Sequence, residues 1–65
     1  MIIEKNHLYK TDEAAEFLRL SRFTVFRLAK TGEIPSVKLG GRVIRFKGDD
    51  LLKIAGFQEN TEIEQ

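Results

Sequence analysis

The sequence has no cysteine, no tryptophan, one histidine and one proline among its 65 residues. Without cysteine, neither a disulfide bond nor a thiolate metal site can support the fold. His7 has no suitably spaced carboxylates that would complete a metal site, so we expect an exposed side chain near one end of the chain. The one histidine also lacks a plausible serine or aspartate setting for a catalytic triad. We therefore expect no enzyme activity, no metal, no cofactor and no small-molecule substrate.

Long apolar runs are missing as well. The longest contain two or three residues, whereas a helix that spans a membrane needs about 20. No signal-peptide pattern is visible. These absences predict a cytoplasmic protein without a membrane partner, and the chain length predicts one small domain with a modest core.

The net charge is +1, but the charges are segregated along the chain. Residues 19–47 carry eight basic side chains and one acidic side chain. Residues 1–18 and 48–65 each carry more acidic than basic side chains. A basic middle between acidic ends is typical of a domain that presents one face to a polyanion.

Residues 21–32 are predicted to form a short basic helix around which the rest of the chain is organised. Ser21 is a good N-cap, and Gly32 stands where a left-handed residue would end the helix. Helical spacing places Val25, Leu28 and Ala29 on one apolar face. The opposite face is largely cationic and carries Phe23, Arg27 and Lys30. Two cations and a phenyl ring on a face opposite the core predict a binding partner.

A first helix is predicted from Asp12 to Leu18 or Arg19, with Thr11 as its N-cap. Small alanines on its apolar stripe would let the second helix approach closely. Only Arg19 and Leu20 separate the two helices, so the helices must cross at a steep angle. This spacing is that of a helix-turn-helix, in which the second helix is presented outward.

After the second helix, Pro35 directs the chain into extended geometry. Residues 36–39 and 42–46 alternate in polarity on either side of Gly40-Gly41, which predicts a β-hairpin because primed turns need positive φ. We expect a loop of two to four residues with Arg42 at or beside its tip. The expected inner side consists of Val37, Leu39, Ile44 and Phe46, and the outer side of Lys38, Val43 and Arg45.

Residues 48–50 are predicted to open a third helix that stops at Gly56. We expect residues 1–7 to be a flexible lead-in, residues 8–57 the folded domain, and residues 58–65 a disordered acidic tail. A short extension of the third helix through Phe57 is the alternative for the start of the tail.

The order helix, turn, helix, hairpin, helix predicts an α+β, mainly helical fold. It is a minimal winged helix-turn-helix, with a two-stranded wing and a C-terminal helix. The expected core side chains are Ala15, Leu18, Leu20, Val25, Leu28, Ile34, Val37, Leu39, Ile44, Phe46, Leu51 and Ile54.

Five segments follow one another at ordinary spacing: LYKTDEAAEFL (8–18), LSRFTVFRL (20–28), GEIP (32–35), VKLGGRVIRF (37–46) and DL (50–51). Together they resemble the excisionase family of small DNA-binding domains, allied to the MerR-type winged helix fold. The resemblance implies a recognition helix and a DNA-binding wing, in small phage or mobile-element proteins that bend DNA or regulate transcription.

Arg19 departs from this family, which often has glycine at the same turn position. If the backbone there is left-handed, Arg19 carries strain of about 1 kcal/mol. Alternatively, the turn differs and changes the angle of the second helix.

The resemblance makes double-stranded DNA the expected partner, with the second helix in the major groove and the wing on the minor groove or on phosphates. Arg22 and Arg27 are expected to contact bases, because a guanidinium fits O6 and N7 of guanine; phosphate is the alternative for each. Phe23 would pack on a thymine methyl group or cover part of the first helix. Phe26 is expected to pack partly against the hairpin.

Thr11 and Ser21 stand at helix N-termini, where free N–H groups bind phosphate, although each residue is also suited to capping. Lys30 is expected to contact phosphate or to remain free. Thr24, Lys38, Arg42 and Arg45 complete the expected interface. Arg42 would enter a minor groove, and Arg45 would contact phosphate or form an ion pair with Glu33 or Asp50.

Three functions compete on this fold. The first is a recombination directionality factor or small transcriptional regulator, whose small footprint would require tandem copies or a partner such as an integrase. The second is a protein-interaction module in which Phe23 and Phe26 form an adhesive patch. The third is a phage packaging DNA adaptor. The cations beside the two rings favour DNA as the partner. A DNA-bound protein would be associated with the nucleoid.

Overall fold

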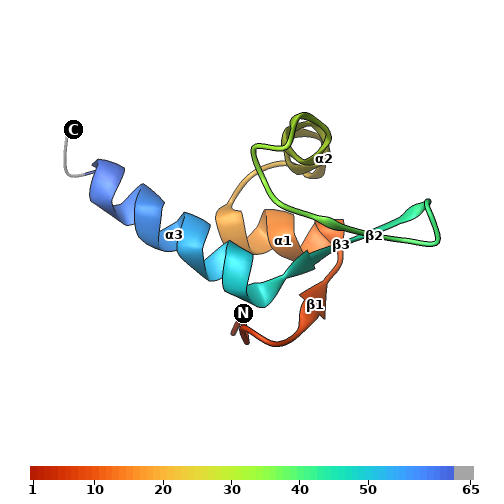
Figure 1. The fold of residues 1–65 in the computed structure, drawn as a ribbon. Helices are drawn as coiled ribbons and strands as arrows, with labels where there is room; N and C mark the ends of the chain where they lie inside the picture. The colour runs from red at the N-terminus through yellow and green to blue at the C-terminus, as the bar shows by residue number, and fades with distance from the viewer. Residues whose placement is uncertain (63–65) are drawn as a thin grey trace.

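The fold is that of a computed structural model, which describes the backbone of residues 1–62 and the side chains of residues 1–56. The elements are β1 (Leu8–Tyr9), α1 (Thr11–Leu18), α2 (Arg22–Thr31), β2 (Val37–Leu39), β3 (Val43–Lys47) and α3 (Gly48–Glu62). The strands form one antiparallel sheet in the order β1-β3-β2. In Figure 1, β2 and β3 project from the helices as a wing, on the side away from the far end of α3. The predicted α+β winged helix-turn-helix is confirmed.

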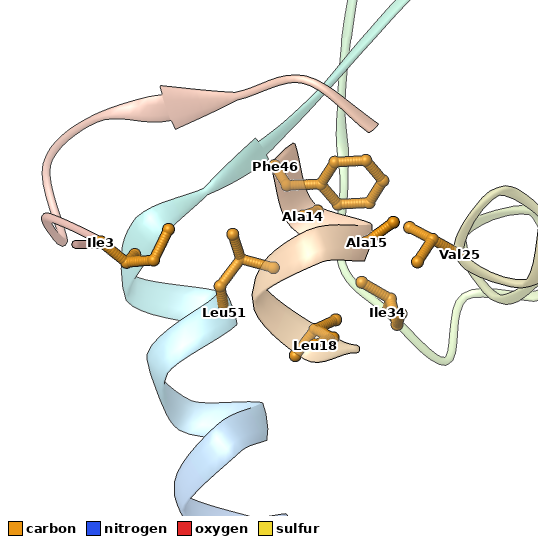
Figure 2. Close-up of a cluster of buried hydrophobic side chains, with 8 residues drawn as sticks. All are labelled: Ile3, Ala14, Ala15, Leu18, Val25, Ile34, Phe46 and Leu51. Atoms are coloured by element: carbon orange, nitrogen blue, oxygen red, sulfur yellow. The ribbon is translucent and has the colours of Figure 1, made fainter. Parts of the chain in front are cut away.

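The core lies where α1, α2, β3 and the start of α3 meet (Figure 2). Its buried side chains are Ile3, Ala14, Ala15, Leu18, Val25, Ile34, Phe46 and Leu51. Four predicted core residues pack against this cluster while partly exposed, namely Leu20, Leu28, Ile44 and Ile54. Small alanines on the buried face of α1 leave room for Val25 and Phe46 to pack against that helix.

The caps of α1 differ from the predicted ones. Thr11 is the first helical residue rather than the N-cap. Instead, the carboxylate of Glu13 accepts a hydrogen bond from the backbone N–H of Lys10 at 2.8 Å, which satisfies the donor at the helix start. At the other end, Arg19 is left-handed, with φ 60° and ψ 41°. The observed turn is therefore the one with a left-handed Arg19. This tight turn sets the direction of α2.

The predicted distribution of side chains over the two sides of the hairpin is wrong. Val37 pairs with Arg45, Lys38 with Ile44, and Leu39 with Val43. Because directly opposed residues share a face, Lys38 lies with Ile44, and Val37 and Leu39 lie with Arg45.

The reason for this difference is the loop. It contains three residues, Gly40, Gly41 and Arg42, and both glycines have positive φ. A shift of one residue in register turns every side chain of a strand to the opposite face. Consequently Leu39 is 44% exposed and Val37 is only half-buried, and neither belongs to the core.

Residues 1–7, expected to be a flexible lead-in, are packed against the start of α3. Ile3 is 9% exposed and belongs to the core. The carbonyl oxygens of His7 and Lys5 accept hydrogen bonds from the N–H groups of Gly48 and Asp49 at 2.9 and 3.1 Å. Lys47, which precedes α3, has no side-chain acceptor, so the N-terminal segment supplies the acceptors that a helix start needs.

The third helix is longer than predicted. It continues past Gly56 to Glu62, so the predicted stop is wrong and the expected tail, residues 58–65, is helical as far as residue 62. Residues 63–65 lie outside the described residues. A glycine inside a helix costs only about 1 kcal/mol relative to alanine, and glutamine and glutamate after it favour continuation.

Candidate nucleic-acid interface

Helix α2 starts and ends as its sequence predicts. The hydroxyl oxygen of Ser21 accepts a hydrogen bond from the backbone N–H of Thr24 at 3.0 Å, and the Ser21 hydroxyl donates to Thr24 Oγ1 at 2.8 Å. Gly32 ends the helix with φ 87°. Ser21 and Thr24 thus have a capping role within the protein, and any phosphate contact by them would be added to it.

The exposed face of α2 presents the predicted side chains to solvent. Phe23 is 74% exposed, so most of its ring is open to solvent and at most a small part of it covers the first helix. Arg27 and Lys30 are exposed as well, whereas Val25 on the opposite face is fully buried. The ammonium of Lys30 lies 5.8 Å from the centre of the Phe26 ring, a cation–π distance that holds this cation over an aromatic surface.

An open groove of about 500 Å³ lies where the first residues of α1 and α2 meet β3. It is lined by Lys10, Thr11, Asp12, Arg22, Phe23, Phe26 and Arg45. Four of these residues were predicted at the interface from sequence: Thr11, Arg22, Phe23 and Arg45. Sequence reasoning missed Lys10, because its position beside the groove depends on the pairing of the two-residue strand β1 with β3.

Arg22 is paired with an acid inside this groove. Its Nη1 donates a hydrogen bond to Asp12 Oδ1 at 2.9 Å. The two side chains are 70% and 63% exposed. This ion pair joins the N-terminal ends of α1 and α2 across the turn, and no sequence pattern indicates it.

Arg45 reaches the groove from the sheet. Its side chain is half-buried, and Nη1 donates to the carbonyl of Ile44 at 2.9 Å. Among the described side chains, neither Glu33 nor Asp50 forms the ion pair with Arg45 that was one of its predicted roles. The charge of Arg45 is therefore not neutralised by either acid, and its side chain lines the groove together with residues of α2.

The remaining two predicted residues lie on the wing and not in the groove. Arg42 is exposed in the loop, where its backbone N–H approaches the Leu39 carbonyl at 3.4 Å. Lys38 is exposed on the sheet face opposite to Arg45. The candidate residues therefore lie in two places, on α2 with the groove and on the wing.

Most cations of residues 19–47 lack acidic partners among the described side chains. Within residues 1–56, only Arg22 among the eight basic side chains of residues 19–47 forms an ion pair.

In the described part of the chain, no cluster of histidine and acidic side chains could hold a metal ion. None of the helices described is both long and apolar enough to cross a membrane.

A family model described as a helix-turn-helix domain matches residues 8–55. The match runs from β1 into α3 and covers both helices of the motif and the wing. It corresponds to the excisionase-like group and confirms the resemblance seen in the sequence, for which the MerR-type label is a looser description. No curated protein and no solved structure gives a significant match.

Proposed function

The chain belongs to the helix-turn-helix domain family, and on this premise we propose that it binds double-stranded DNA in a sequence-dependent manner. Helix α2 would enter the major groove, and the wing would contact the adjacent minor groove or its phosphates. Domains of this family are typically not enzymes, so the proposed activity is binding alone, in the cytoplasm and on the nucleoid.

One observation carries this proposal: the cations of residues 19–47 are largely without ion-pair partners, and all of them except the half-buried Arg45 are exposed. Seven of the eight have no ion-pair partner among the described side chains. Cations left without acids raise the local positive potential, which attracts a polyanion and releases its counterions on binding. A surface evolved only for solubility would mix both signs more evenly.

The side chains on α2 supply the chemistry for contacts to base edges. Arg27 projects from the exposed face, and its guanidinium can donate two parallel hydrogen bonds to guanine. Phe23 is 74% exposed, and its ring would pack on a thymine methyl group. Lys30 and Arg45 flank these side chains and are suited to phosphate, which fixes the orientation of the protein on the duplex.

The finer role that we propose is a recombination directionality factor or a small transcriptional regulator. A single α2 and a single wing have a small footprint, so specific binding would require further copies on tandem sites or a partner such as an integrase. A packaging adaptor would use the same DNA surface, and neighbouring genes would distinguish it.

A second candidate function rests on the exposed rings of α2. Phe23 and Phe26 are 74% and 43% exposed and neighbour each other on the helix. In a protein-interaction module, these rings would form the contact and the cations would serve only for solubility. Measurements with DNA separate the two functions.

The test is fluorescence anisotropy of a labelled mixed-sequence duplex titrated with protein at several salt concentrations. The logarithm of the association constant is expected to fall linearly with the logarithm of salt, with a slope of about −0.9 for each phosphate contacted. Lys30→Ala is expected to reduce the slope by about 0.9. Lys53→Ala is the control, because Lys53 lies on α3 and pairs with Asp49. Absence of binding at low salt would favour the protein-interaction module.

A further inference from the structure

The ion pair between Asp12 and Arg22 places an acid on the surface proposed to face DNA. Asp12 is the one acidic side chain among the residues that line the groove, beside Phe23 and Phe26. A carboxylate next to phosphates is repelled by them, and capping of α1 does not require it because Glu13 provides that hydrogen bond. Its contact with Arg22 offers another role.

We infer that Asp12 is a positioning residue that holds Arg22 for contact with a guanine base and makes binding depend on sequence. This inference rests on the proposed DNA-binding function and assigns one source of its specificity.

The geometry of the guanidinium supports this role. Arginine has five N–H donors in a planar fork, and Asp12 occupies only Nη1. Within the described residues, the Arg22 side chain forms no other hydrogen bond. The edge formed by Nε and Nη2 therefore keeps two parallel donors, and this pair matches O6 and N7 of guanine.

The ion pair also reduces the cost of presenting that edge. Arg22 is the first residue of α2 and is 70% exposed, so an unheld side chain would sample many rotamers and lose them on binding. Asp12 restricts these rotamers before DNA arrives. Preorganisation of this kind increases affinity for the matching base without any new contact.

The charge of Asp12 penalises the wrong sequences. In the free protein, water and salt screen the exposed pair, so its contribution to folding is small. When DNA covers the groove, water leaves and Asp12 depends on Arg22 for neutralisation. Arg22 is then prevented from turning to a phosphate, and at bases other than guanine its free edge lacks the matching acceptors. Specificity arises from this mismatch as well as from the favourable contact.

The test compares Asp12→Ala with Glu16→Ala. Both variants remove one negative charge from α1, and Glu16 is exposed and outside the groove. A preferred duplex is first selected from a random pool with the wild-type protein. Affinities for this duplex and for a mixed-sequence duplex are then measured by fluorescence anisotropy.

Asp12→Ala is expected to bind the mixed-sequence duplex more tightly than the wild type does. Its ratio of preferred to mixed affinity should fall by roughly 5- to 150-fold, the range for one bidentate base contact. A repeated selection should lose its requirement for one G·C pair. Glu16→Ala should strengthen binding to both duplexes equally and leave the ratio unchanged.

Two variants of Arg22 distinguish positioning from a structural role. Arg22→Lys keeps the charge but not the planar fork of donors. It should therefore retain affinity for the mixed-sequence duplex, while its ratio of preferred to mixed affinity falls. In an Arg22→Ala background, Asp12→Ala should leave the ratio unchanged, because the residue that it positions is gone.

The inference is overturned if Asp12→Ala keeps the wild-type ratio and selected site, or if it lowers the ratio equally in the Arg22→Ala background. A wild type that binds all duplexes with equal affinity overturns it as well, although the proposed DNA binding then stands. No binding by the wild type at low salt would instead reject both.

Discussion

Gly48 lies so close to the backbone of Glu4 that a Cβ at residue 48 would overlap the carbonyl oxygen of Glu4. The contact joins the N-terminal segment to the first residue of α3. Since backbone and not a flexible side chain occupies the space, the contact can be relieved only by movement of one segment.

Gly48→Ala is therefore expected to lower the free energy of unfolding by about 1–3 kcal/mol through overpacking. Gly56→Ala is the matched control, because Gly56 lies within the same helix and a Cβ there meets no atom within 4 Å. It should stabilise the protein by about 0.5–1 kcal/mol, since alanine favours helix over glycine. Thermal and urea unfolding of both variants measure the effects, and equal effects would contradict the close approach.

Ile3→Ala is expected to destabilise the protein by about 2–4 kcal/mol, because Ile3 is 9% exposed and packs in the core. Ile2→Ala removes the same atoms from a side chain that is 85% exposed, and should change stability by less than about 0.5 kcal/mol. Urea unfolding at constant pH compares the two. A flexible N-terminal segment would make the two variants alike.

Arg19→Gly is expected to raise the free energy of unfolding by up to about 1 kcal/mol. Arg19 has φ 60°, and glycine adopts this left-handed conformation without the steric cost that a Cβ brings. The added flexibility of the unfolded chain offsets part of this gain. A clear loss of thermal stability would show that the Arg19 side chain contributes more than the strain costs.

Arg27→Ala is expected to weaken binding to the preferred duplex by about 1–3 kcal/mol, as for a side chain that contacts a base. Stability should be unchanged because Arg27 is exposed and has no ion-pair partner among the described side chains. Anisotropy titrations with preferred and mixed-sequence duplexes are the measurement. An equal loss with both would assign Arg27 to a phosphate, and unchanged affinity would remove it from the interface.

Arg42→Ala is expected to weaken binding to DNA, with a thermal midpoint within a few degrees of that of the wild type. Arg42 is exposed in the three-residue loop of the wing, so its removal leaves no cavity. Duplexes with an A·T tract beside the preferred site should show the larger loss, because their narrow minor groove concentrates negative potential. A large drop in the midpoint would identify Arg42 as structural.

The parts of the fold that sequence predicted correctly depend on local chemistry. The Ser21 hydroxyl caps the start of α2, and Gly32 ends the helix because glycine accepts the left-handed backbone there; both effects act wherever the rest of the chain lies. Gly40-Gly41 likewise identifies a hairpin. It does not determine loop length, because loops of two or three residues both accept positive φ there, and the extra residue moved Leu39 out of the core.

The parts that sequence could not predict depend on residues distant in the chain. Strand β1 has two residues, too few for a periodic pattern, and exists because β3 pairs with it. The groove contains Lys10 for the same reason. The pair of Asp12 and Arg22 required the relative placement of two helices, which the strained turn at Arg19 sets and composition does not show.

The hydrogen bonds from Gly48 and Asp49 to the carbonyls of His7 and Lys5 join the first residues of the chain to its last helix. Local fraying of the N-terminal segment would leave these N–H groups without acceptors, so opening there is coupled to opening of α3. The two amides are consequently reporters of cooperativity. Their hydrogen exchange should match that of the core strand β3 if the domain opens as one unit, and should be faster if the N-terminal segment detaches alone.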